Sequence, residues 1–381
     1  MRSNAAPVPL HVLDAILRTD FVSFIRKAFQ TVSPGERFLE NWHIEAMAYH
    51  LLKVVRGETR RLIITIPPRH LKSICTSVAL PAFILGHDPT RRIICVSYSQ
   101  DLAVKHANDF RTVLKSDWYR RLFPGTRIDP AKDTQTEIMT TRKGFRLATS
   151  VGGTLTGRGG NLIIIDDPIK PEEAMSDTTR ERLIQWCGNT LLSRLDHKEQ
   201  GAIIVVMQRL HVGDLAGHFL TQGGCQHLNL PAIAEVEETI EIGPERYHVR
   251  KVGDLLHAAR ESRATLDLIK AGMGSATFSA QYQQSPVPPG GNMVKWEWFR
   301  WYDPDDLDVD DVVISWDTAI KPTEFADYSV GTVWAIKGNF YYLLDVVRDR
   351  LPFPALTRKV RQTHSANRGG GVRRQPDPGA S

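Results

Sequence analysis

The chain has 381 residues, of which 42% are hydrophobic and 24% charged, which is the composition of an ordinary globular protein. Its length allows two or three domains and excludes a small module that depends on disulfides or metals for stability. The net charge of +5 is concentrated at one end: six of the 48 basic and one of the 43 acidic residues lie after residue 356, which leaves 42 of each before it. The charge balance by itself therefore does not indicate nucleic-acid binding.

The cysteines and the N-terminus bear on the cellular compartment. The four cysteines form no CxxC or Cys/His pattern, which argues against a zinc site or a disulfide framework and favours a reducing compartment. The N-terminus lacks the apolar core of a signal peptide, and no stretch approaches the roughly 18 apolar residues of a membrane span. The sequence therefore predicts a cytoplasmic protein without membrane association.

The first 230 residues alternate short apolar runs with longer helical stretches. Helices are predicted at residues 101–114 and 178–195. Buried parallel strands are predicted at four runs, namely residues 62–66, 93–96, 162–165 and 203–207. This alternation predicts an α/β fold with a mostly parallel sheet.

The apolar pattern changes in the last third of the chain. It weakens from residue 231 to 284, and the Pro- and Gly-rich segment that follows predicts a domain boundary. After an acidic stretch, three β-like segments joined by short turns predict an antiparallel meander. The predicted organisation is a first domain with a helical lead-in, a linker, a partial second domain and a disordered basic tail, at residues 1–284, 285–310, 311–360 and 361–381.

The segment RRLIITIPPRHLKSICTS places a strand, a tight turn, Lys-Ser and a helix start in succession, as a phosphate-binding loop does. In such a loop a lysine reaches the β and γ phosphates and a hydroxyl binds Mg²⁺, and Lys72 and Ser73 fit these roles. Ile66 and Leu71 occupy the places of the two motif glycines, so a loop with a surface lysine is the alternative. The loop residues expected around the phosphates are Pro68, Arg69, His70 and Leu71.

A second element, NLIIIDDPIK, is an apolar strand that ends in two acids. Asp166 at the strand tip would hold Mg²⁺ through water, and Asp167 would orient or deprotonate the attacking water in phosphoryl transfer. The alternative is a helix N-cap, because Asp followed by Pro often starts a helix.

Two other polar segments are expected at the same sheet edge. The glycine-rich segment GGTLTGRGG presents Arg158, with a plain connecting loop as the alternative. The strand IIVVMQRLH ends in Gln208 and Arg209, which would sense the γ-phosphate, because open α/β sheets bind ligands at the carboxyl ends of their strands. Solvated strand-end residues are the alternative there.

An aromatic pair lies upstream of the phosphate loop, in the segment NWHIEAMAYHLL. Trp42 and His43 offer a surface that would face an adenine base. The alternative is an amphipathic helix that uses Trp42 as part of its core face.

These motifs, in this order and spacing, resemble the large terminase subunit of tailed bacteriophages and prophages. The resemblance spans roughly residues 35–355 and is carried by RLIITIPPRHLKS, RIICVSYSQDLA, GFRLATSVGGTLTGRGGNLIIIDDPIK and VVMQRLHVGDLAGHFL. It implies a P-loop ATPase of the ASCE type, with ATP and Mg²⁺ as cofactors, followed by an RNase H-like nuclease domain. It also implies a homo-oligomeric ring that docks on a portal protein and threads double-stranded DNA into a procapsid in the bacterial host cytoplasm, usually with a small terminase subunit as partner.

The sequence departs from the family pattern at two positions. Leu71 stands where many relatives have Gly, and Asp167 stands where Glu is more usual. Glu172 and Glu173 are therefore alternative water-activating carboxylates. In a ring of this kind a neighbouring subunit's arginine can complete the site, and the candidates are Arg158 first and Arg69 second.

In the second region, Asp317 ends one predicted strand and Asp327 starts the next. Two-metal phosphodiester cleavage with Mg²⁺ or Mn²⁺ needs several carboxylates, and the resemblance marks Asp317 as the first nuclease acid and metal ligand and Asp327 as its companion. Strand-turn aspartates are the alternative. The later elements that carry the remaining nuclease acids in the family are missing, so we expect a partial nuclease domain that does not cut DNA alone.

Two other functions stay open at this point. The first is a helicase-type DNA-dependent ATPase, against which the absence of a second ATPase-like half argues. The second is a non-enzymatic remnant, which an ATPase rate that is lost in Lys72→Ala would exclude.

Overall fold

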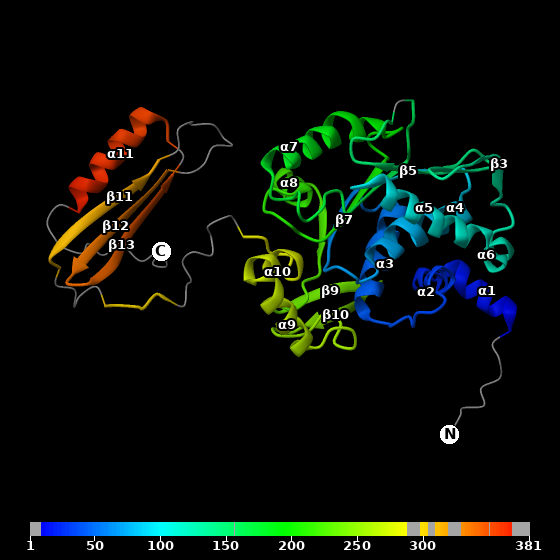
Figure 1. Cartoon of the computed structure of the whole chain (residues 1–381), viewed down its shortest axis with the longest axis horizontal. Coiled ribbons are helices and arrows are strands. Elements are labelled where there is room, and N and C mark those ends of the chain that lie inside the picture. Colours follow the sequence, from blue (N-terminus) through cyan, green and yellow to red (C-terminus); the bar gives the residue numbers. More distant parts are fainter. Residues whose placement is uncertain are drawn as a thin grey trace, which may run out of the picture. The chain divides into compact units, whose positions relative to one another are not determined.

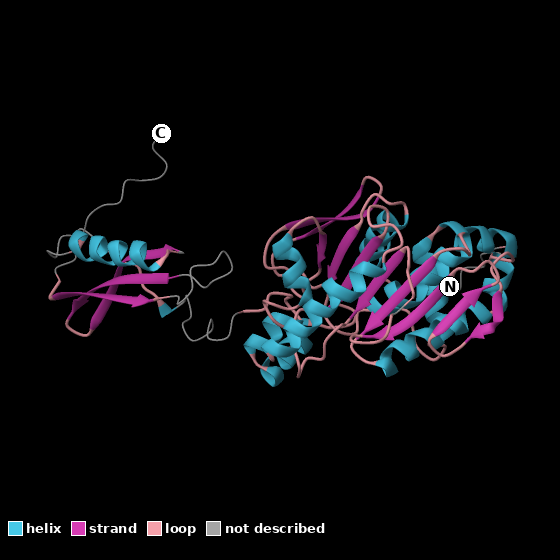
Figure 2. Cartoon of the chain, turned by 90° about the horizontal axis from the view of Figure 1, so that it is seen from above, coloured by secondary structure: helices cyan, strands magenta, loops and turns pink. Residues whose placement is uncertain are grey.

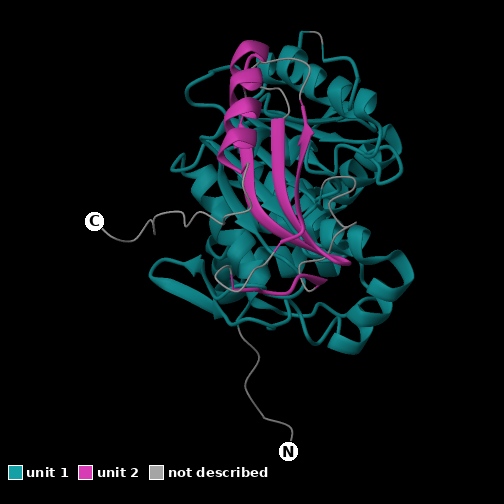
Figure 3. Cartoon of the chain, turned by 90° about the vertical axis from the view of Figure 1, so that its left-hand side faces the viewer, with its two compact units in different colours: residues 1–292 teal, residues 293–381 magenta. Residues whose placement is uncertain are grey.

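The computed structural model describes residues 9–155, 157–287, 298–303, 309–318, 329–349 and 351–367. The chain divides into two compact units, Met1–Asn292 and Met293–Ser381, which Figure 3 shows in different colours. This division lies eight residues after the boundary expected at 284. Each unit is described by itself.

Unit 1 is built around an eight-stranded sheet with the order β3-β4-β5-β2-β6-β7-β1-β8 (Figure 1). The strands from β5 to β8 in this order pair in parallel, whereas β3 and β4 run antiparallel at one edge. Their bounds are β1 Arg61–Thr65, β2 Arg92–Ser97, β3 Ile128–Asp133, β4 Glu137–Thr140, β5 Phe145–Ser150, β6 Leu162–Asp166, β7 Ala202–Met207 and β8 Gln226–Asn229.

The central strands β1, β2, β6 and β7 are the four apolar runs that the sequence predicted as parallel strands. They are apolar on both faces because helices cover both sides of the sheet. Alternate residues enter two separate cores: Ile64 and Ile164 pack on one side, and Ile63 and Ile165 on the other. The mostly parallel α/β fold predicted from the sequence is confirmed.

Helices form a layer on each face of this sheet, as Figure 2 shows. The larger core lies under α1 Leu10–Thr19, α2 Phe21–Val32, α3 Trp42–Val55, the π-helix η1 Ile74–Ala79, α4 Leu80–His87, α5 Gln100–Lys115 and α6 Asp117–Leu122. The opposite core lies under α7 Asp177–Trp186, the π-helix η2 Cys187–Leu191, the 3₁₀ turn η3 Leu192–Arg194 and α8 Leu215–Gln222.

The last part of unit 1 packs beside the sheet and its two layers of helices. It consists of the hairpin β9 Glu238–Gly243 and β10 Arg246–Arg250 and the helices α9 Arg263–Met273 and α10 Ser275–Gln281. Among the residues that the structure describes, no helix is both long enough and apolar enough to cross a membrane.

Unit 2 contains a three-stranded antiparallel sheet in the order β11-β12-β13, followed by a helix. The predicted meander is therefore confirmed. The helix α11 Phe353–Ala366 corrects the prediction that the tail begins at residue 361. Residues 361–366 continue the helix because Leu356 and Thr363, two helical turns apart, are both buried on one face. The bounds of the strands are β11 Asp311–Asp317, β12 Ser329–Lys337 and β13 Phe340–Asp349.

Candidate nucleotide-binding site

The sheet topology brings the predicted phosphate motifs together at one edge. The loop that carries Lys72 follows β1, Asp166 ends β6, and Gln208 follows β7. Strand β7 lies between β1 and β6 and pairs in parallel with both. Because the carboxyl ends of parallel strands meet at the same edge, three segments far apart in the sequence converge there.

Asp166 lies at the base of this site and is 1% exposed. It accepts hydrogen bonds from the hydroxyl of Ser73 at 3.1 Å and from the hydroxyl of Ser77 at 2.7 Å. Burial raises the pKa of the Asp166 carboxyl, and the hydrogen bond from Ser77 is the largest effect that opposes this rise. Ser73 and Asp166, which were predicted to bind a metal together, are thus hydrogen-bonded to each other. Their hydroxyl and carboxylate groups supply the oxygen ligands that Mg²⁺ prefers.

Asp167 faces the lysine of the loop. The Nζ atom of Lys72 lies 3.0 Å from Oδ2 of Asp167, and the backbone N–H of Gln208 donates to Oδ1 at 3.3 Å. Burial raises the pKa of the Asp167 carboxyl, and the charge of Lys72 opposes the rise. The Asp167 side chain keeps 26% of its surface exposed, so it remains reachable from solvent. The two consecutive aspartates therefore have different surroundings, one enclosed by hydroxyls and one beside a cation.

Two buried residues behind Asp166 were missed by the sequence analysis. The Nδ1 atom of His106 lies 3.6 Å from Oδ2 of Asp166, and burial lowers the pKa of His106 to about 4. Arg146 is 1% exposed, and its Nε donates to the backbone oxygen of Ser77 at 3.2 Å. Ser77 thus bridges the carboxylate and the buried cation. The signal that could have revealed Arg146 is a charged residue inside the apolar strand β5.

Two residues of the loop have left-handed backbone conformations although neither is a glycine. Leu71 has φ 62° and Arg69 has φ 65°, both in the left-handed region that glycine occupies most readily. Leu71 stands at one of the missing glycines and is partly buried against the larger core. Leu71 therefore has a left-handed conformation that is strained for a residue other than glycine.

We expect Leu71→Gly to change the free energy of unfolding by less than about 1 kcal/mol, because relief of the left-handed strain is offset by lost packing and by the greater freedom of glycine in the unfolded chain. Leu71→Val should destabilise the protein by more than about 1 kcal/mol, because a β-branched residue fits this conformation poorly. Denaturant unfolding of both variants measures the difference. Equal stability of the two would contradict the left-handed assignment.

The structure places Trp42 and His43, the two residues predicted to face adenine, in different surroundings. His43 lines a small pocket beside the loop with His70 and His257, and burial holds the pKa of His43 well below its usual value. The Nε2 atoms of His43 and His257 are buried and have no hydrogen-bond partner among the residues that the structure describes. The ring of Trp42 stacks on His248 instead, with centroids 4.2 Å apart, and is not part of the pocket. Trp42 also packs against the larger core, as the alternative of an amphipathic helix expected, because adjacent residues on a helix point in different directions.

Two predicted arginines are engaged within their own chain. Arg158 forms an ion pair with Glu137 at 2.7 Å, and its side chain is 37% exposed. Arg209, predicted as a γ-phosphate sensor, is buried, and its Nε lies 3.0 Å from both carboxylate oxygens of Asp214. The Oε1 atom of Gln208, the other predicted sensor, is buried and has no hydrogen-bond partner in the described part of the chain.

The remaining predicted positions are placed as follows. Pro68 and His70 belong to the loop itself, where Nδ1 of His70 lies 2.9 Å from the Pro68 oxygen. The alternative carboxylates Glu172 and Glu173 lie exposed in the turn after Asp167. In unit 2, Asp317 ends β11 and is exposed. Asp327 lies outside the described residues, and among the residues that are described no cluster of three or more His, Cys, Asp or Glu side chains could hold a metal.

Comparisons with known proteins give fold neighbours only. No protein-family model matches the chain, and the search of curated proteins found no match. Among solved structures, the large terminase of a thermophilic bacteriophage overlaps 85% of this chain and 75% of its own, with 9% identity and a TM-score of 0.39. The ATPase domain of the Thermus phage P74-26 large terminase overlaps 68% of this chain and 98% of its own, with 14% identity and a TM-score of 0.42. All of these overlaps have low identity and TM-scores below 0.5, so the function proposed below rests on the geometry of the site.

Proposed function

We propose that unit 1 binds ATP at the carboxyl edge of its sheet and hydrolyses it. The observation that carries the proposal is the convergence of Lys72, Asp166 and Asp167, with Lys72 and Asp167 in contact at 3.0 Å. A lysine on a loop between a strand and a helix and two acids at a neighbouring strand end are the groups that phosphoryl transfer to water requires. Strand β7 lies between the strands that carry these groups and brings Gln208 to the same edge, which supports the assignment.

Each residue has a distinct task in this proposal. Lys72 would bind the β and γ phosphates, and Ser73 and Asp166 would hold Mg²⁺, which supplies positive charge against the phosphate oxygens. Asp167 would accept a proton from the attacking water or orient it, and the free Oε1 of Gln208 would help to fix that water. When nucleotide binds, the Lys72 ammonium would have to leave Asp167 and contact a phosphate instead. The Asp167 carboxylate would then be available to the attacking water.

The base would lie on the His43 side of the loop. The pocket there is lined by residues from α3, the phosphate loop and the segment after β10. Two buried imidazole Nε2 atoms without partners, from His43 and His257, are suited to hydrogen-bond the edge of a purine. This proposal keeps His43 from the predicted pair and drops Trp42.

The finer biological role that we propose is a DNA-packaging motor subunit. It is supported by the motif order that the sequence shares with large terminase subunits. The proposed partners are double-stranded DNA, a portal protein with its procapsid, a small terminase subunit and further copies of this chain in a ring. Arg158 or Arg69 of a neighbouring copy would complete the ATP site, and Arg158 would first have to leave Glu137. An endonuclease role for unit 2 would rest on Asp317, with Mg²⁺ or Mn²⁺ as its cofactor, and we expect that the chain does not cut DNA alone.

The proposed ATPase is tested by measuring Mg²⁺-dependent phosphate release by the purified chain, with and without DNA. We expect Lys72→Ala to lower the rate by at least about a hundredfold, because a cation aimed at the developing phosphate charge is lost. Lys105→Ala is the control, because Lys105 is an exposed lysine paired with Asp109 on α5. A folded wild-type chain without activity, or equal activity in both variants, would overturn the proposal.

A further inference from the structure

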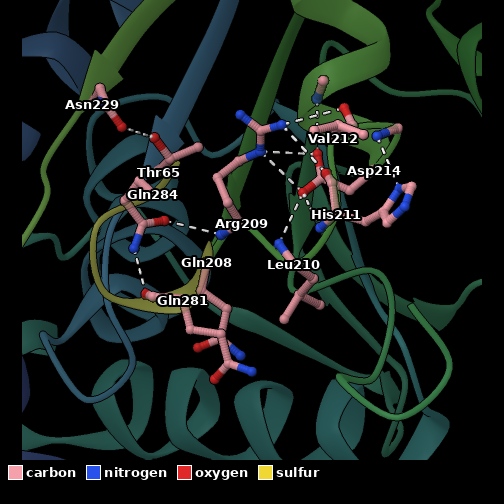
Figure 4. A network of polar contacts seen from close by, with 12 residues as sticks. Thr65, Gln208, Arg209, Leu210, His211, Val212, Asp214, Asn229, Gln281 and Gln284 are labelled. Carbon is pink, nitrogen blue, oxygen red and sulfur yellow. Dashed lines mark hydrogen bonds and ion pairs between the residues drawn. The ribbon is translucent and has the colours of Figure 1, made fainter. Parts of the chain in front are cut away.

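Two adjacent buried glutamines, Gln283 and Gln284, follow the last helix of unit 1. Their side chains attach to different parts of the unit. Gln283 accepts from the backbone N–H of Ile233 and donates to the Ile233 oxygen, both at 3.0 Å. Gln284 accepts from the backbone N–H of Arg209 at 2.9 Å, as Figure 4 shows. Of these two glutamines, Gln284 is the one whose side chain hydrogen-bonds to the end of β7 in the described part of the chain.

The end of β7 is also where the catalytic carboxylate is held. The N–H of Gln208 donates to Oδ1 of Asp167, and the next N–H along the chain, that of Arg209, donates to Oε1 of Gln284. The acceptors Asp167 and Gln284 are thus bound by two consecutive backbone N–H groups of the same segment. A change in the tilt of this short segment alters the hydrogen bond to Asp167.

Other contacts hold the chain on both sides of the peptide group between Gln208 and Arg209. The Arg209 guanidinium is held by Asp214, which also accepts from the backbone N–H groups of Leu210 and His211 (Figure 4). These contacts hold the chain after Arg209. Before it, the oxygen of Met207 accepts from the backbone N–H of Ile66, and the N–H groups of Gln208 and Arg209 donate to Asp167 and Gln284. Gln284 therefore anchors the peptide group between Gln208 and Arg209 from outside the phosphate site.

The backbone of Gln284 indicates that this contact is specifically maintained. Gln284 has φ 55°, a left-handed conformation that is unfavourable for a residue other than glycine. Such residues persist where the surrounding contacts determine the conformation. Here the side-chain amide also donates to the Gln281 oxygen, which orients its oxygen toward Arg209.

We propose that Gln284 is a positioning residue for ATP hydrolysis, which holds the end of β7 so that Gln208 keeps Asp167 in place. This inference rests on the proposed ATPase function. Loss of the Gln284 acceptor leaves the Arg209 N–H buried without a partner, and the segment can then rotate away from Asp167. Lys72 contacts the other carboxylate oxygen of Asp167, Oδ2, so we expect nucleotide binding by Lys72 to be unaffected.

The test compares Gln284→Leu with Gln283→Leu, a matched loss of a buried glutamine that does not touch β7. We expect Gln284→Leu to lower kcat about ten- to a hundredfold with KM for ATP changed less than about threefold, since small displacements of a catalytic group have effects of this size. Gln283→Leu should leave kcat within about threefold of wild type. Gln284→Glu keeps an oxygen acceptor and should retain most of the activity.

Amide hydrogen exchange supplies a readout that is independent of activity. Exchange at Arg209 should accelerate in Gln284→Leu and stay slow in Gln283→Leu and Gln284→Glu. Equal kcat values for the two leucine variants in an active wild-type background, or unchanged exchange at Arg209, would overturn the positioning role alone. An inactive but folded wild-type chain would instead overturn the ATPase function and this role with it.

Discussion

Asp167→Asn is expected to lower the rate of ATP hydrolysis by about a thousandfold while ATP binding is retained or tightened. A general base of this kind contributes about 10² to 10⁴ in rate, and an amide cannot accept the proton. The amide oxygen can still accept from the N–H of Gln208, so the local fold is kept. Binding should not weaken, because Lys72 loses the carboxylate that lies 3.0 Å away and becomes fully available to phosphate.

The measurement is phosphate release together with equilibrium binding of a fluorescent ATP analogue. Asp196→Asn is the matched control, because Asp196 has a similar exposure and also faces a basic residue, Arg92, at the opposite end of the strands. Asp167→Glu should retain part of the activity. Wild-type hydrolysis by Asp167→Asn would show that another group activates the water, with Glu172 and Glu173 as the next candidates.

Asp214→Ala is expected to reduce the free energy of unfolding by about 4 kcal/mol, because removing one partner of a buried ion pair leaves an uncompensated charge. Asp214 is 1% exposed and accepts from Arg209 Nε. It also caps helix α8 by accepting from the N–H of Gly217 at 2.8 Å, and the loss of a cap adds to the cost. This is the largest stability effect that we expect from a single substitution in unit 1.

Denaturant unfolding measures this effect, with Asp267→Ala as the control. Asp267 pairs with Arg263 on the surface of α9, where both side chains are more than half exposed, so its loss should cost less than about 0.5 kcal/mol. Adding Arg209→Met to Asp214→Ala should recover part of the stability, because the buried charge is then removed as well. A cost for Asp214→Ala no greater than that of the control would contradict the buried pair.

The sequence alone predicted the parts of unit 1 that depend on local patterns. Strands β1, β2, β6 and β7 are continuous apolar runs because both faces of a parallel sheet are covered, and such a run is visible without a structure. The loop with Lys72 and Ser73 and the pair Asp166 and Asp167 were found because these residue types are adjacent in the chain. Their convergence followed from one rule, that ligands bind at the carboxyl ends of parallel strands.

Other features depended on residues far apart in the sequence, and no local pattern contains them. The hydrogen bond from Ser77 to Asp166 joins two segments 89 positions apart, and that from Arg209 to Gln284 joins segments 75 apart. Arg209 looked like a phosphate sensor at a strand end, and only its buried contact with Asp214 shows that the guanidinium is used within the fold. Packing decides which of several polar residues at an edge faces the ligand.

Backbone conformation was the other property that the sequence left open. The absence of a glycine at Leu71 suggested a departure from the phosphate-loop motif, yet the residue has the left-handed conformation that glycine adopts there. In unit 2, residues 361–366 looked like part of a tail, and they continue α11 because Leu356 and Thr363 are buried on one face. In both places the free energy of tertiary packing exceeds the local conformational preference, which is about 1 kcal/mol per residue. Local sequence patterns thus predicted the strands of the sheet and the site motifs, whereas packing between distant segments decided the contacts that complete the site.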